Sequence, residues 1–174
     1  MRLFSNASQT RGLLLAVCWG TMCAAVIPAA EPSVRFATFN IQELTLKKLH
    51  EVDAAGRGTH PQLLAAAAVL RRIRPDVLLL NEIDYTGPAD ADGPIERNAA
   101  RLFMERYLQH AEGESAGLDY PHLFYRATNT GVPTGLDLNN DGDATGPNDA
   151  YGYGTYPGEY GMALLSRFPI DASK

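Results

Sequence analysis

The sequence has few cysteines, and both lie close to its start. Cys18 and Cys23 are the only two among 174 residues. If the first thirty residues are removed, as argued below, the remaining chain has no thiol, no disulfide and no cysteine-bound zinc. Such a domain depends on its hydrophobic core, or on bound ions, for its stability.

The chain also lacks a surplus of positive charge. It has 15 Lys and Arg against 20 Asp and Glu, for a net charge of −5. Proteins that bind DNA tightly and without sequence preference neutralise phosphates with basic side chains, so the charge argues against that class. It does not exclude an enzyme that cuts a polyanion with the help of metal ions. The length and the 45% hydrophobic content are typical of one globular domain.

The apolar run at residues 12–27 is too short for a confident membrane span. It follows Arg2 and Arg11 and precedes the small residues Pro28-Ala29-Ala30. This arrangement predicts a secretory signal peptide at residues 1–30, cut near residue 29 or 30. We therefore expect an exported protein, periplasmic or extracellular, without a stable membrane anchor after cleavage. An uncleaved N-terminal anchor is the alternative.

Residues 74–85, Arg-Pro-Asp-Val-Leu-Leu-Leu-Asn-Glu-Ile-Asp-Tyr, contain an apolar run that ends in acidic residues. Residues 77–80 predict a strand buried on both faces, and Glu82 lies at its carboxyl end, where α/β sheets hold ligands. A carboxylate is costly to bury unless a cation or a proton neutralises it, so we interpret Glu82 as a ligand of a hard metal ion. The alternative is a strand end at which Glu82 and Asp84 are simply hydrated.

A first strand is predicted at residues 34–41, with Asn40 near its carboxyl end. A helix over residues 63–73 follows, preceded by a capping box formed by Thr59 and Gln62. Strand, helix and strand in this order predict a right-handed parallel crossover, which places Asn40 and Glu82 at the same edge of one sheet. The amide oxygen of Asn40 would then face the Glu82 site; alternatively, Asn40 only begins a turn.

The remaining predicted elements complete an α/β pattern. A second helix is expected from Pro94 to about residue 111, and two further strands at residues 120–127 and 161–170. The histidines are interpreted as surface or capping residues: His50, His60, His110 and His122.

Residues 131–160 form a loop rich in Gly, Asp and Tyr, which is long for a compact domain. Part of it repeats the alternating oxygen ligands of the first half of a calcium loop: Asp137, Asn139, Asp141 and Asp143, with the turn glycine Gly142. Asn148 stands where an EF-hand has its bidentate glutamate, with Asp149 next to it, and no flanking helices are evident. We interpret this stretch as an isolated Ca²⁺ turn or, alternatively, as a solvated cluster of turn residues. The tyrosines of the loop either line a substrate rim or pack the loop.

Three segments together resemble the amino-terminal half of the endonuclease/exonuclease/phosphatase superfamily, which includes the deoxyribonuclease-like enzymes, neutral sphingomyelinases and inositol-polyphosphate phosphatases. They are Thr-Phe-Asn-Ile-Gln at 38–42, Arg-Pro-Asp-Val through Asn-Glu-Ile at 74–83, and Gly-Met-Ala-Leu-Leu-Ser-Arg-Phe-Pro-Ile at 161–170. Each segment is weak alone, but the three occur in the family's order and spacing. The loop at 131–160 looks like that of an exported bacterial branch.

The resemblance implies the amino-terminal half of a four-layer α/β sandwich, in which two packed mixed sheets are flanked by helices. It also implies hydrolysis of phosphate esters with Mg²⁺ or Mn²⁺. Glu82 matches the family's metal-binding glutamate, and Asn40 matches the family's asparagine. The substrate class is a nucleic acid, a phospholipid or a small phosphate ester.

The family's later motifs, an Asp-x-Asn, a second catalytic aspartate and a terminal Ser-Asp-His, do not follow residue 170. We therefore expect residues 31–174 to be an incomplete domain of a longer phosphoesterase, inactive alone because the catalytic base is missing. The alternative function is a secreted calcium-binding or surface interaction module without catalysis.

Overall fold

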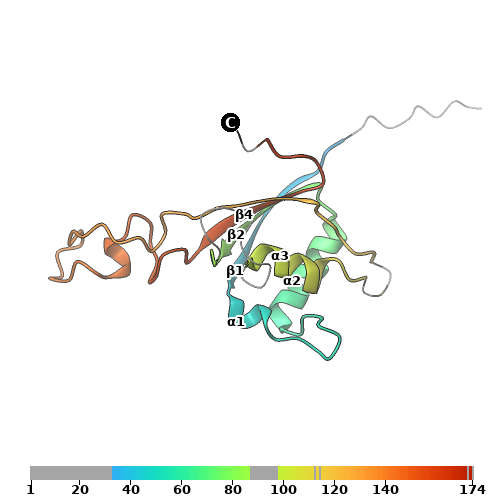
Figure 1. Ribbon diagram of the computed structural model, residues 1–174, viewed down its shortest axis with the longest axis horizontal. Helices are drawn as coiled ribbons and strands as arrows, with labels where there is room; N and C mark the ends of the chain where they lie inside the picture. Colours follow the sequence, from blue (N-terminus) through green and yellow to red (C-terminus); the bar gives the residue numbers. More distant parts are fainter. Residues whose placement is uncertain (1–32, 87–97, 112, 114, 172, 174) are drawn as a thin grey trace, which may run out of the picture. The chain divides into compact units, whose positions relative to one another are not determined.

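Four strands of the described chain form one mixed sheet, in the order β1-β2-β4-β3 (Figure 1). They are β1 (Phe36–Leu44), β2 (Val77–Ile83), β3 (His122–Tyr125) and β4 (Gly161–Ser166). β1 and β2 are parallel, as the strand-helix-strand order predicted, whereas β4 runs antiparallel to both β2 and β3. All four predicted strands are therefore present, and β1 and β2 extend past their predicted ends.

This computed structural model describes residues 33–86, 98–111, 113, 115–171 and 173. The predicted signal peptide and residues 94–97 of the predicted second helix lie outside these residues. Within them, no helix combines the length and the apolar character needed to cross a membrane.

The helical segments are short except for α2. They are α1 (Leu46–Leu49), α2 (Pro61–Ile73), α3 (Ala99–Phe103), the π-helical turn η2 (Met104–Leu108) and the 3-10 turn η3 (Pro147–Asp149). α3 and η2 follow each other without a break, so the described part of the predicted second helix is helical to residue 108. Residues 131–160 contain only η3, as the loop prediction required.

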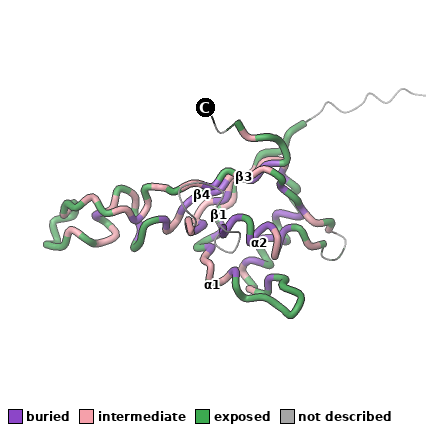
Figure 2. Tube along the Cα trace, viewed as in Figure 1, coloured by how far each residue is buried: buried purple, intermediate pink, exposed green. Residues whose placement is uncertain are grey.

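Among the described residues, helices cover only one face of the sheet. Leu78, Leu80 and Leu165 point to that face and are buried with α2, α3 and η2 in one core. Residues that alternate with them point to the opposite face, where Phe124 and Met162 are 38% and 49% exposed. The tube in Figure 2 shows buried and exposed positions along the strands. The described residues thus contain one sheet with helices on one side, rather than the two sheets of the predicted sandwich.

The predicted capping box before α2 is wrong. His60, not Thr59, is the N-cap residue, and it makes no side-chain capping bond. Pro61 occupies the first turn, where a missing backbone N–H costs little. Gln62 is therefore free for another role, described below. The predicted end of the helix is confirmed, because Arg74 adopts a left-handed backbone (φ 52°) before Pro75.

Two neighbouring leucines of β2 test this one-sided burial. Leu80→Ala should lower the free energy of unfolding by about 2–5 kcal/mol, because Leu80 is fully buried and its loss leaves a cavity. Leu79→Ala should cost clearly less, because Leu79 lies half-buried on the open face. Urea denaturation of both variants measures the difference. Equal losses would contradict an uncovered face.

Candidate functional site

The regular pairing of β1 and β2 breaks at their carboxyl ends. Pairing between the two strands shifts between Asn40 and Leu44, and pairing between β2 and β4 shifts between Asn81 and Ile83. At these breaks Gln42, Glu43 and Glu82 have positive φ angles of 54°, 55° and 60°. These are β-bulges made of non-glycine residues in left-handed backbone, a conformation that is uncommon and concentrates at functional sites.

The bulge in β2 decides where Glu82 points. Leu78 and Leu80 face the core, so strict alternation would also place Glu82 in the core and turn Ile83 outward. Instead, Ile83 is fully buried and Glu82 is only half-buried. In β1, Leu44 likewise returns to the core after the break. The bulges therefore turn the acidic side chains away from the core, while the residues that follow them, Leu44 and Ile83, remain buried.

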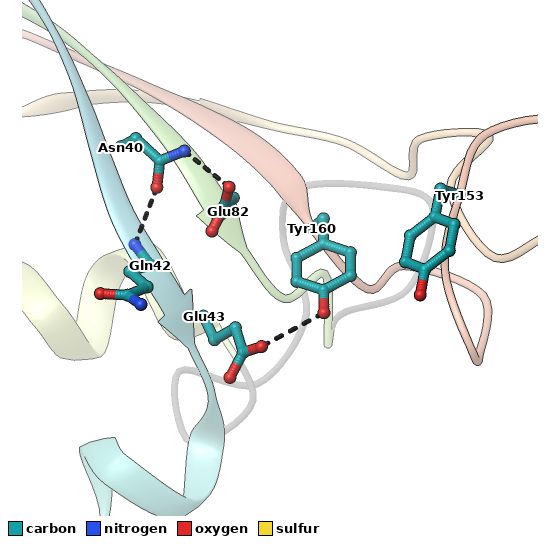
Figure 3. Close-up of a pocket in the computed structure, with 6 residues that line it drawn as sticks. All are labelled: Asn40, Gln42, Glu43, Glu82, Tyr153 and Tyr160. Atoms are coloured by element: carbon teal, nitrogen blue, oxygen red, sulfur yellow. Dashed lines mark hydrogen bonds between the residues drawn. The ribbon is translucent and has the colours of Figure 1, made fainter. Parts of the chain in front are cut away.

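Asn40 and Glu82 meet at this edge of the sheet, as the sequence predicted. The Asn40 Nδ2 donates a hydrogen bond of 2.6 Å to the Glu82 Oε1, and Gln42 N donates one of 2.9 Å to the Asn40 Oδ1 (Figure 3). The predicted convergence is confirmed, but the atom is not the expected one. The nitrogen of Asn40 faces Glu82, while its oxygen is occupied by the bulge. Asn40 thus orients the carboxylate.

The side-chain amide of Gln62 and the ammonium group of Lys48 hold the bulge in β1 from outside the sheet. Gln62 Nε2 donates to the carbonyl oxygens of Ile41 and Gln42, both at 2.6 Å. Lys48 Nζ donates to the carbonyl oxygens of Gln42 and Glu43, at 3.2 and 2.7 Å. The left-handed residues turn their carbonyl groups out of the sheet, and these bonds give the carbonyls partners.

A pocket of about 660 Å³ lies over the Asn40–Glu82 pair (Figure 3). Its lining residues are Asn40, Gln42, Glu43, Glu82, Tyr153 and Tyr160. Six non-glycine residues of the described chain have positive φ, and four of them line this pocket. The sequence signalled the tyrosines only as a possible rim, and it gave no sign of Gln42 and Glu43.

Tyr160 and Tyr153 form the aromatic wall of the pocket. Their rings stack with centroids 6.3 Å apart, and the Tyr160 hydroxyl donates to the Glu43 Oε1 at 3.2 Å. Desolvation, followed by the charge of Glu159, raises the pKa of Tyr160 to about 12. Tyr160 therefore keeps its proton at neutral pH and remains a donor toward Glu43.

Asp84 ties the long loop to the end of β2. Its side chain is 5% exposed, so it is not the hydrated carboxylate considered for this strand end. The Tyr156 hydroxyl donates to the Asp84 Oδ2 at 2.7 Å, and Tyr85 N donates to the Gly158 carbonyl at 2.7 Å. Gly158 has a φ of 93°, and a Cβ there would lie 2.7 Å from the Tyr85 carbonyl oxygen, so only glycine fits.

The pocket offers oxygen ligands that suit a hard divalent ion. The carboxylates of Glu82 and Glu43 line the same pocket (Figure 3). In the described chain no three His, Cys, Asp or Glu side chains come close enough together to hold a metal ion, so the pocket supplies two carboxylates rather than a closed cage. Such an open set fits Mg²⁺, which usually binds one or two carboxylates and keeps several waters.

The other predicted candidates lie elsewhere. Asp137, Asn139, Asp141 and Asp143 belong to the turn before η3 and do not line the pocket. None of the four histidines lines it either. Metal binding at Glu82 and calcium binding at the turn both stay predictions.

Comparison with known protein families gives a match over most of the chain. Residues 37–174 match the family described as "Endonuclease/Exonuclease/phosphatase family". Comparisons with curated proteins and with solved structures gave no match. The match covers both strands that carry the pair, and the loop that supplies the two tyrosines.

Gln62→Leu tests what holds the bulge. The substitution keeps a helix-compatible side chain but leaves the Ile41 and Gln42 carbonyls without their amide donor, so the free energy of unfolding should fall by about 1–3 kcal/mol. Amide hydrogen exchange should speed up at Gln42 and Glu43. Gln109→Leu is the matched control, because Gln109 bonds only an exposed carboxylate, that of Asp119. Equal losses in both variants would contradict a specific role for Gln62.

Asp84→Asn tests the buried carboxylate. Burial raises the pKa of Asp84 above its usual 3.8, against the opposing bond from Tyr156. The folded protein therefore holds this proton more tightly than the unfolded chain, and wild-type stability falls as pH rises past 3.8 and through the raised pKa. The variant has no carboxyl group at this position, so its stability does not fall with pH for this reason. The difference in unfolding free energy, variant minus wild type, should therefore increase with pH. Urea denaturation from pH 3.5 to 7 measures it; a difference that does not change with pH would contradict the assignment.

Proposed function

Because the chain belongs to the endonuclease/exonuclease/phosphatase family, we propose that it supplies the metal-binding half of a phosphoesterase site. The family hydrolyses phosphate esters and generally uses a divalent metal such as Mg²⁺. The observation that carries the proposal is the contact between Asn40 and Glu82 at the carboxyl ends of two parallel strands. The sequence predicts that the two residues converge at this edge, and their contact lies inside a polar pocket.

Each pocket residue has a role that follows from its contacts. Glu82 would hold Mg²⁺ or Mn²⁺ through the carboxylate that Asn40 orients, and Glu43 offers a second carboxylate nearby. When bound, the ion would stabilise the negative charge that builds on a phosphoryl oxygen and on the leaving group. Tyr160 donates to Glu43 and so restrains its rotamer. The exposed Tyr153 is free to contact a substrate.

The orientation of Glu82 is set before any ligand arrives. The Asn40 amide is itself fixed by Gln42 N, and the bulge that carries Gln42 is fixed by Gln62 and Lys48. A carboxylate held in this way loses little freedom when it binds an ion. The proposal therefore treats Asn40 as a positioning residue and Glu82 as the ligand.

The finer parts of the family assignment are also proposals. The open apolar face around Leu79, Phe124 and Met162 has the character of a surface on which a second sheet packs, which supports the four-layer sandwich. That the catalytic base comes from outside these residues is likewise a proposal, and it rests on the family resemblance of the sequence. Export, and membership of an exported bacterial branch, rest on the sequence of residues 1–30 and 131–160.

Glu82→Gln is the direct test of the metal role. The amide keeps the shape and can still accept the bond from Asn40, but it removes the charge, so Mg²⁺ affinity measured by isothermal titration calorimetry should fall more than about tenfold. Asn40→Ala should weaken Mg²⁺ by about 10–100-fold, as loss of an orienting partner does. Hydrolysis of bis(4-nitrophenyl) phosphate by the natural full-length protein should need Mg²⁺ and fall in the same variants.

Glu51→Gln is the control, because it makes the same charge change at an exposed residue away from the pocket. It should bind Mg²⁺ as wild type does. If wild type takes up no Mg²⁺, or if Glu82→Gln binds and hydrolyses as wild type does, the proposal fails.

A further inference from the structure

The segment that carries the long loop is negatively charged and contains no positive charge of its own. Residues 127–166 include no Lys, Arg or His. They contain five acids: Asp137, Asp141, Asp143, Asp149 and Glu159. Four of the five fall within thirteen consecutive residues, between Asp137 and Asp149. Any cation that compensates them has to come from another part of the protein or from solution.

Asp149 has no such compensation in the described chain. It is fully buried, and its Oδ1 accepts a hydrogen bond of 2.7 Å from Leu138 N. Its Oδ2 is also buried and has no hydrogen-bond partner. Its backbone carbonyl is held by Thr134. A buried carboxylate oxygen without a donor is costly, so its position indicates a missing partner.

The Asp149 carboxylate lies against the turn formed by residues 137–143. Leu138, whose backbone N–H donates the hydrogen bond to Asp149, stands between Asp137 and Asn139. In the turn, the two oxygens of Asp137 accept from Asp141 N and Gly142 N, at 3.2 and 2.9 Å. Asn139 Oδ1 also accepts from Asp141 N, at 3.0 Å. The backbone thus directs these oxygens, while each retains a lone pair.

We propose that residues 137–149 bind one calcium ion, with the free oxygen of Asp149 as its buried ligand. The oxygens of Asp137, Asn139, Asp141 and Asp143 would supply the remaining ligands. Asp149 is the thirteenth residue counted from Asp137, one position beyond the acid that closes a twelve-residue EF-hand loop. The loop therefore closes with Asp149 rather than with Asn148.

Calcium fits this set better than magnesium does. Ca²⁺ accepts six to eight oxygens in flexible geometry, whereas Mg²⁺ demands a near-ideal octahedron and keeps several waters. The acids of the turn are not gathered around one point in the described chain. The Asp141 Oδ2 accepts from Asn139 Nδ2 at 2.8 Å, and this contact has to open when the ion binds. That rearrangement suits the weak affinity of extracellular calcium modules, with a Kd of about 10⁻⁴–10⁻³ M.

Bound calcium would also steady the segment that leads to the pocket. Pro133 pairs with Ala150, next to Asp149, and Thr130 pairs with Gly152, next to Tyr153. The calcium turn is thus connected by two short backbone pairings to the aromatic wall. The calcium site itself does not depend on the phosphoesterase proposal.

The test is calcium titration of the calcium-free full chain by isothermal titration calorimetry. Wild type should bind one Ca²⁺ with a Kd of about 10⁻⁴–10⁻³ M, and Asp149→Asn should weaken it more than about tenfold. Glu159→Gln is the matched control. It removes one charge from the same segment at a half-buried residue whose carboxylate bonds only to Thr155, and should bind calcium as wild type does.

Asp137→Asn keeps the test decisive if far-UV circular dichroism shows that Asp149→Asn does not fold, because Asp137 is only half-buried whereas Asp149 is fully buried. It should lower calcium affinity in the same way. Three results would overturn the proposal. They are no calcium uptake by wild type at 10 mM (about tenfold above the weakest expected Kd), unchanged uptake by the folded Asp149 or Asp137 variant, and uptake that disappears in Glu82→Gln, which would place the ion in the pocket.

Discussion

The site depends on a few residues held in left-handed backbone at the carboxyl ends of two parallel strands. Gln42, Glu43 and Glu82 are not glycines, so each conformation costs about 1–3 kcal/mol and persists only because the surroundings enforce it. Gln62 and Lys48 enforce it in β1 by binding the carbonyl groups that leave the sheet. In β2 the buried Ile83 on the far side of the bulge fixes the position of Glu82. Without these bulges, the strand that carries Glu82 would direct it into the core.

The pocket is assembled from three separate parts of the chain. β1 and β2 contribute the polar pair, and the segment before β4 contributes Tyr153 and Tyr160. That segment is anchored by the bond between Tyr156 and Asp84. An acid two residues beyond Glu82 therefore holds the aromatic wall beside the carboxylate. The order of the strands explains this, because the start of the antiparallel β4 lies next to the end of β2.

Much of this could be predicted from the sequence, because its strongest signals are strand signals. The apolar run before Glu82 and the helix between the strands were enough to place Asn40 and Glu82 together. Sequence rules failed where backbone conformation departs from residue preference. Nothing marks Gln42 or Glu43 as left-handed, since glycine and asparagine are the usual residues there. The bulge also determines which atom of Asn40 faces Glu82, so the expectation of its oxygen was wrong. Gln62 looked like a capping residue because its spacing fits, but the bulge carbonyls compete for its amide.

The most direct test of the account is a crystal structure of the protein soaked with Mn²⁺, with anomalous scattering to locate the ion. The account predicts an anomalous peak within about 2.0–2.2 Å of a Glu82 carboxylate oxygen, with Asn40 Nδ2 still bonded to that carboxylate and with Gln42 and Glu43 still left-handed. A peak elsewhere with none at Glu82, or a Glu82 that leaves Asn40 and turns away from the ion, would contradict it.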